Sequence, residues 1–186
     1  MKKILIILML CGLLFESSAQ EISVEKSTFG IQTGWFGIWL YNEAKLSNRL
    51  VLRSELGLSG EYYLNGYYEN TWFLVGPSLT LEPKWYYNIK RRNDNGKSIV
   101  SNCANSLSLN TKYIPDWFTE SNNDDLTFFN QISIIPTWGL RRNIGHHFNY
   151  EIGSGIGYRY IFKPSTNQGN KSELAVNIHL RIGYKF

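Results

Sequence analysis

The sequence predicts an all-β fold, a closed antiparallel transmembrane β-barrel of about eight strands in meander order. Three observations predict it. Apolar and polar residues alternate with period two along most of the chain. The alternating segments run roughly 12 to 18 residues, whereas strands of soluble proteins have about 5 to 6. Aromatic residues make up 15% of the chain and gather near the segment ends, as in the interfacial girdles of membrane barrels.

The composition excludes several other classes of protein. The chain has 186 residues, enough for one domain of ordinary size. Only 18% of the residues are charged, which excludes a disordered chain and a coiled coil. The mean hydropathy of −0.26 excludes a helical membrane protein but not a barrel, because alternating strands also average near zero. The formal net charge of +4 is too small to indicate a nucleic-acid partner, and we expect none.

Residues 1–19 are predicted to form a cleaved signal peptide. Met1–Lys3 carries two lysines, Ile4–Phe15 is apolar, and Ser17–Ala19 places small residues before a cleavage site. The apolar run is shorter than the ~20 residues that a membrane-spanning helix needs. We therefore expect an exported protein whose single domain, an outer-membrane β-barrel, covers residues 20–186.

Seven segments alternate clearly. They cover residues 28–41, 49–62, 72–89, 101–115, 127–141, 147–162 and 173–186. Bacterial outer-membrane barrels have an even number of strands, so one strand is missing from this count. The alternation loses its phase near Gly34 and Gly37. We expect the region 22–41 to contain a tight hairpin or a short extra strand that brings the number to eight.

Prolines and connections refine this prediction. Pro77, Pro83 and Pro136 fall inside the segments, where proline removes a hydrogen-bond donor, so we expect bulges there or donor positions outside the paired core. Short or basic turns are expected at 42–48, 91–97 and 142–146, and longer loops at 63–70, 116–125 and 163–172. Because such barrels keep their short turns in the periplasm, the C-terminus is expected on the periplasmic side.

The polar phase of the strands predicts what fills the lumen. An eight-stranded barrel is only wide enough inside to hold side chains. The charged or titratable residues on this phase are Arg53, Glu55, Glu61, Glu82, Lys84, Lys112, Arg141, Glu151, Arg159, His179 and Arg181. Buried charges need partners, and both signs are present, so we expect a salt-bridged plug. A selective ion path through this plug is the alternative.

The last strand resembles a known assembly signal. The chain ends in Phe186 with Tyr184 two residues before it, as in the insertion signal read by the outer-membrane assembly machinery, although Arg181 replaces the usual glycine. Together with LEPKWYYNIKRR, ISIIPTWGLRRNIGHHFNYEIG and HLRIGYKF, it makes the chain similar to the small outer-membrane barrel proteins of Bacteroidota, of the OmpA- and OmpW-like type. The resemblance implies an outer-membrane location among outer-membrane lipids and lipopolysaccharide, with the assembly machinery as a partner. It implies no catalytic residue.

A search for catalytic groups finds little. His179 and Glu151 share the polar face of neighbouring segments, but Ser154 lies on the opposite phase. His146 and His147 are adjacent and point apart on a strand, which makes a poor metal pair. A lipid-modifying outer-membrane enzyme would need His179 or His147 beside a usable serine and acid. We expect no catalysis, no cofactor and no metal, and instead a structural, adhesive or narrow-transport role.

Two further features bear on that role. Aromatic residues gather in two predicted loops, where they would extend the outer aromatic girdle or contact glycan, peptide or another protein; they are Tyr62, Tyr63, Tyr67 and Tyr68 in one loop and Trp117 and Phe118 in the other. The alternative from another class of protein is a soluble exported lipocalin-like barrel that binds a hydrophobic ligand. That barrel would turn Ile178 and Ile182 inward and Arg181 outward.

Overall fold

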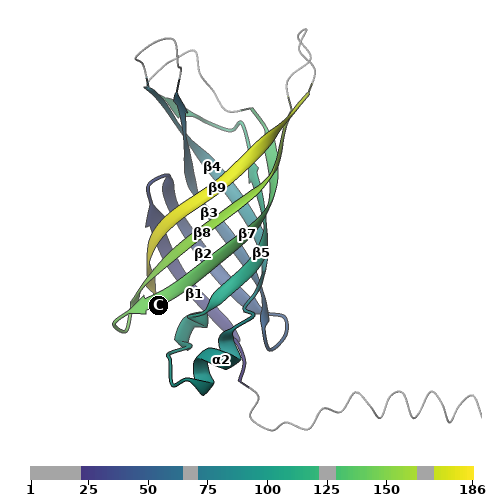
Figure 1. Cartoon of the computed structure of the whole chain (residues 1–186). Coiled ribbons are helices and arrows are strands. Elements are labelled where there is room, and N and C mark those ends of the chain that lie inside the picture. The colour runs from purple at the N-terminus through teal and green to yellow at the C-terminus, as the bar shows by residue number, and fades with distance from the viewer. Residues whose placement is uncertain (1–21, 65–70, 122–128, 163–169) are drawn as a thin grey trace, which may run out of the picture.

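The computed structural model describes residues 22–64, 71–121, 129–162 and 170–186, and shows a closed barrel of eight antiparallel strands (Figure 1). The strands of the ring are β1 (Ser27–Gly34), β2 (Gly37–Lys45), β3 (Leu50–Leu64), β4 (Thr71–Trp85), β5 (Asn105–Ile114), β7 (Gln131–Ile144), β8 (Phe148–Ile161) and β9 (Lys171–Lys185). Neighbours in sequence are neighbours in the ring, which closes between β1 and β9. The predicted eight-stranded meander barrel is confirmed. The predicted signal peptide, residues 1–19, lies outside the described residues.

The predicted hairpin supplies the eighth strand. β1 and β2 pair from Ser27–Ala44 to Gly34–Gly37, with Trp35 and Phe36 at the tip. Gly37 has a φ of 150°, and a Cβ there would overlap the Leu58 carbonyl oxygen, so the turn depends on glycine. β2 continues to Lys45, and the predicted turn at 42–48 is therefore wrong in its first residues.

The three prolines lie where the strand ladder is interrupted on one side. Pro77, Pro83 and Pro136 each pair with one neighbouring strand. Each proline lacks a pair with the neighbour on its other side. The β4–β5 ladder is interrupted at Pro83 and ends before Pro77, and the β7–β8 ladder is interrupted at Pro136. Every pairing of the described strands keeps a single register. The expected missing donors are thus confirmed, and the expected bulges are wrong.

A short cap covers one end of the barrel, called the lower end here. It contains α2 (Ile89–Asp94), which lies below the strands in Figure 1, and a 3₁₀ helix (Val100–Asn102). The predicted segments 72–89 and 101–115 are therefore shorter as strands, and the predicted turn at 91–97 is mostly helical. The cap buries an apolar cluster made of Val24, Val51, Tyr86, Ile89 and Ala104. No helix among the described residues is long and apolar enough to span a membrane.

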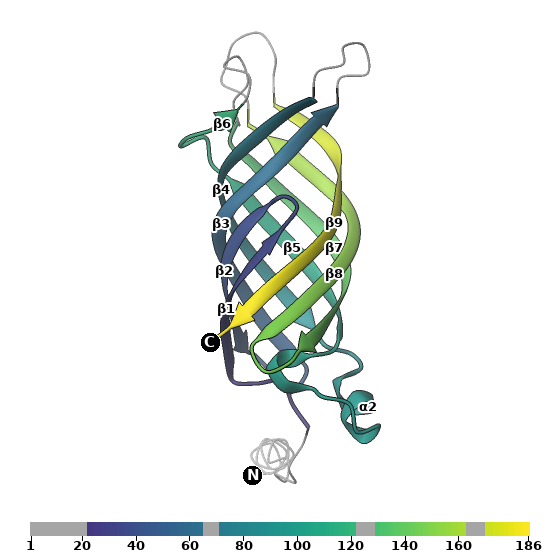
Figure 2. The same ribbon diagram turned by 90° about the vertical axis from the view of Figure 1, so that its left-hand side faces the viewer.

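One further strand lies outside the ring. β6 (Glu120–Ser121) pairs with Leu74 and Val75 of β4 at the upper end (Figure 2). Trp117 and Phe118, just before it, are exposed.

The barrel turns its apolar face outward and its charged face inward. Ile178 and Ile182 of β9 are 67% and 53% exposed, whereas Arg181 between them is only 5% exposed. The same holds around the ring, where Leu56, Leu81, Ile134 and Ile152 are exposed. This arrangement is the reverse of a lipocalin-like barrel, which needs an apolar interior, so that alternative is wrong.

Candidate functional site in the barrel lumen

Strand register builds a belt of alternating charges inside the lower half of the barrel. Glu43 of β2 lies opposite Arg53 of β3, and Arg53 lies opposite Glu82 of β4. On the other side of the ring, Arg141 of β7 lies opposite Glu151 of β8, which lies opposite Arg181 of β9. Because side chains alternate in and out along each strand, these residues all point into the lumen at similar depth.

Glu151 is the acceptor on which three cations converge. Its carboxylate accepts hydrogen bonds from Arg53 Nη1 at 3.1 Å and from Arg141 Nη2 at 2.8 Å. Lys84 Nζ donates to its other oxygen. Gln32 Nε2 adds a fourth donor at 3.2 Å. A carboxylate with this many charged donors retains its charge in the interior, where an unpaired ion would be costly.

Glu43 is the second acceptor and joins the plug to the cap. Arg141 Nη2 and Arg53 Nη1 donate to Glu43 Oε1 at 2.7 and 3.2 Å. From the cap, Asn102 Nδ2 donates to Oε2 at 2.8 Å, and the Tyr86 hydroxyl lies within 3.0 and 3.1 Å of the two oxygens. Burial raises the pKa of the Tyr86 phenol well above its ordinary value, so it stays a neutral donor.

An aromatic ring contacts two cations of the plug. The Arg53 guanidinium lies over the Tyr41 ring, 4.3 Å from its centroid, and that of Arg141 lies 5.4 Å away. Desolvated cation–π contacts of this kind stabilise like charges that must share a small volume. With its ion pairs and the cap beneath it, the plug closes the lower half of the lumen.

The structure places all of the predicted lumenal residues inside the barrel. Those in or bordering the plug are Arg53, Glu55, Glu82, Lys84, Arg141, Glu151 and Arg181, each buried. Lys112, Arg159 and His179, together with Glu61, line a cavity above it. The sequence prediction missed Glu43, because residue 43 was assigned to a turn. The signal was present, since Trp39, Tyr41 and Glu43 share one phase of β2.

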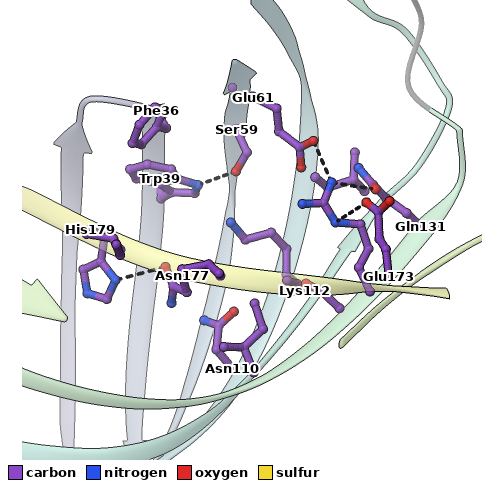
Figure 3. A pocket seen from close by; sticks show the side chains of 18 of the residues that line it. Phe36, Trp39, Ser59, Glu61, Asn110, Lys112, Gln131, Glu173, Asn177 and His179 are labelled. Atoms are coloured by element: carbon purple, nitrogen blue, oxygen red, sulfur yellow. Dashed lines mark hydrogen bonds and ion pairs between the residues drawn. The ribbon is translucent and has the colours of Figure 1, made fainter. Parts of the chain in front are cut away.

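The upper half of the lumen contains a cavity of about 390 Å³ (Figure 3). Arg159 crosses it and donates to Glu61 Oε2 at 2.7 Å, while its Nε lies 3.6 Å from Glu173. The floor is Arg181, whose Nη1 donates to Glu55 at 2.8 Å and whose guanidinium lies 4.2 Å from the Trp39 ring centroid.

His179 in the cavity wall has an amide as its neighbour. Its Nδ1 lies 3.3 Å from Asn177 Oδ1, and Nε2 has no hydrogen-bond partner in the described part of the chain (Figure 3). Ser154, the serine that the sequence singled out, lies on the outer face of β8. His179 is therefore not aligned between a serine and an acid, the geometry that a serine nucleophile needs. Across residues 22–64, 71–121, 129–162 and 170–186, no group of three or more metal-ligating side chains converges.

The chain was compared with protein-family models, with curated proteins and with solved structures, and none of the three comparisons gave a match.

Proposed function

We propose that this chain is an integral outer-membrane β-barrel protein with a structural or adhesive role and no catalytic activity. It would be exported through residues 1–19 and anchored among outer-membrane lipids and lipopolysaccharide. The observation that carries the proposal is the inverted barrel, with apolar side chains outside and ion pairs inside. Such a surface suits a lipid solvent, because an apolar belt of this extent exposed to water would drive association.

The height of the apolar belt supports this location. On β9 every outward side chain from Leu174 to Tyr184 is apolar or aromatic and exposed. Ten steps of about 3.3 Å at a tilt of about 45° span about 23 Å, close to the ~25 Å apolar band of outer-membrane barrels. Exposed aromatic residues border it, with Trp85, Phe148, Tyr184 and Phe186 toward the lower end and Tyr158, Tyr160 and Phe162 toward the upper end.

The plug favours a structural or adhesive role over transport through the barrel. Ion pairs cross the lower lumen between opposite walls, and the cap buries its own apolar cluster below them. At the upper end, Trp117 is 69% exposed and Phe118 is 49% exposed. Exposed aromatic rings of this kind suit contact with glycan or protein.

The C-terminal strand fits the proposed assembly signal. β9 closes the ring against β1, and the Phe186 ring packs 5.7 Å from Phe29 and 5.5 Å from Tyr184. We expect Phe186→Ala to lower the amount of folded protein in the outer membrane, because the assembly machinery reads this residue. Phe118→Ala, an exposed aromatic residue far from the closing strands, is the matched control and should leave that amount unchanged.

Membrane fractionation tests the proposal. The protein should resist carbonate extraction from outer membranes and run as a heat-modifiable band on gels. Ile178→Lys places a charge near mid-belt and should destabilise the inserted barrel by about 2–4 kcal/mol, whereas Ser172→Lys beyond the belt should have little effect. Recovery of the protein as a free periplasmic species would contradict the proposal.

A further inference from the structure

The wall of the barrel is incomplete above the β1–β2 hairpin. β9 pairs with β1 only up to Arg181, although it extends to Lys171. β3 pairs with β2 only up to Ser59, with one further bond from Gly60 N–H to the Phe36 carbonyl. Figure 2 shows the hairpin ending part-way up the wall, with β3 and β9 continuing on either side of it. In the described residues these two strands are not paired with each other.

The lumenal cavity reaches this gap. Its lining includes Phe36 at the hairpin tip, Glu61 of β3 and Asn177 of β9, the last two lying above the registers that pair these strands with the hairpin (Figure 3). It also includes Val176 and Ile178, which belong to the outward face of β9 and are 55% and 67% exposed. The lining thus follows β9 residue by residue from Ala175 to His179, along the part of the strand that has no partner in β1. The cavity therefore opens sideways.

The opening lies at the depth of the apolar belt. The hairpin tip is level with Arg181, because Gly34 pairs with that residue. Above it, the exposed apolar side chains of β9 continue from Leu180 to Leu174. Six residue steps correspond to about 14 Å of height within the belt. Unpaired strand edges are tolerated at membrane depth only where they line a polar or water-filled cavity, and these edges do.

Among the described residues that line the cavity, Lys112 is a cation without an ion pair at contact distance, although Glu55 and Glu61 act on it from farther away. The charge of Arg159 is matched by Glu61 and Glu173, and that of Arg181 by Glu55. Lys112 projects into the cavity, where it has no ion pair within 4.0 Å and no hydrogen bond in the described structure (Figure 3). The Nε of Arg181, on the cavity floor, also lacks an acceptor there. Both groups are donors only, so a ligand that satisfies them is an acceptor and preferably an anion.

We propose that the opening admits a single-chain fatty acid from the upper leaflet, with its carboxylate bound by Lys112 in the cavity and its acyl chain against the apolar rim at Phe36, Val176 and Ile178. The cavity volume of about 390 Å³ lies within the range of small-molecule sites. The cation, the membrane depth and the apolar rim at Phe36, Val176 and Ile178 together select an anionic amphiphile rather than a free anion. The inference rests on the proposed membrane location, because lateral entry needs a lipid phase.

Photolabelling with dodecanoate that carries a diazirine at the chain end tests this inference. The full-length protein is labelled in vesicles of phosphatidylethanolamine and phosphatidylglycerol, and cross-links are mapped by mass spectrometry. Labels should concentrate at Phe36, Val176 and Ile178. Lys112→Met should reduce this labelling by about tenfold to a hundredfold, as expected for a lost charged contact, and Lys112→Arg should restore it.

Matched probes and variants separate the proposal from other outcomes. Lys90→Met, an exposed lysine of α2, should leave the labelling unchanged, and heat-modifiable migration confirms that each variant is folded. Diazirine-bearing dodecanol should label the whole belt without dependence on Lys112. Acetate or phosphate at the dodecanoate concentration should not displace the probe, and displacement would overturn the proposal in favour of a simple anion site.

Two further results would overturn the site. If both probes label a membrane-inserted barrel uniformly, the lateral site is wrong and the proposed function still stands. If the protein is recovered outside membranes, the proposed function itself is wrong. A polypeptide found cross-linked along residues 171–180 in place of the probe would show that a partner strand completes the wall.

Discussion

In the described part of the chain, Glu151 has three cationic partners, more than Glu43, Glu55 or Glu82. Replacing it by glutamine would leave Arg53, Arg141 and Lys84 short of one negative charge in the interior. Removing one partner of a buried ion-pair network costs about 3–5 kcal/mol. Glu151→Gln should therefore lower the free energy of unfolding by about this amount, measured by urea titration of the detergent-solubilised barrel.

The matched control for that substitution is Glu120→Gln. Glu120 is exposed on β6, outside the ring, and its replacement should change the free energy of unfolding by no more than about 0.5 kcal/mol. Equal effects of the two substitutions would contradict the view that the plug stabilises the barrel.

The free energy of unfolding should depend on alkaline pH through Tyr86. Its phenol donates to Glu43, and burial raises its pKa well above the ordinary value of 10.0. Since the folded pKa lies above the unfolded one, the stability that Tyr86 contributes is fully present below pH ~10 and is lost as the pH rises further. Tyr86→Phe should cost about 1.5–3 kcal/mol at neutral pH and should flatten the decline above pH ~10.

The comparison of the two proteins isolates the phenol, because they differ only in the hydroxyl group of residue 86. Urea titrations at several pH values between 8 and about 11.5 provide the measurement. Parallel stability curves for the wild type and Tyr86→Phe would show that the hydroxyl does not contribute through protonation.

At the scale of the elements, the β1–β2 hairpin sets both the strand number and the lateral gap. Gly37 enters the turn with a φ of 150°, and a Cβ there would overlap the Leu58 carbonyl. Gly37→Ala should therefore destabilise the barrel by more than the ~1 kcal/mol of an ordinary glycine replacement, through loss of the β2–β3 pairs next to the turn. Gly139→Ala, where the nearest atom lies at 3.4 Å, is the control and should be tolerated.

Hydrogen exchange of the backbone amides reports this prediction directly. In Gly37→Ala, protection should fall for Ile38 and Leu58, which flank the turn in the β2–β3 register, and should persist in β8 and β9. Uniform loss of protection would instead indicate that the whole barrel unfolds more readily.

The strands and the lumenal residues could be predicted because the alternation of apolar and polar residues shows which side of a sheet each residue faces. Even the hidden hairpin left a signal, the change of phase at Gly34 and Gly37. α2 left none, since its six residues bury only Ile89 and it has no side-chain cap. Glu43 was missed for a related reason. Residues 42–48 were predicted as a turn, and Trp39 and Tyr41, which share the phase of Glu43, face inward beneath arginine side chains, which a pattern of hydropathy does not reveal.

The lateral gap could not be predicted either, because it depends on how strands of unequal length fit around a ring. β1 has 8 residues and β2 has 9, whereas β3 and β9 have 15 each. The alternation in the sequence predicts strand lengths only approximately. Lys112 of β5 lies opposite the gap because the sheet closes into a ring, which the alternation does not show.

At the scale of the whole molecule, the plug and the cap divide the lumen into a closed lower half and a cavity that is open to the side. In planar lipid bilayers the wild-type protein should show no stepwise ion conductance, because ion pairs join opposite walls across the lower lumen. Removing opposite charges together, as in Arg141→Ser with Glu151→Ser, keeps the net charge constant and opens space where the two strands face each other. This double variant, checked for heat-modifiable migration, should conduct in steps. Steady conductance of the wild-type protein would contradict the plug and favour the ion path through the lumen.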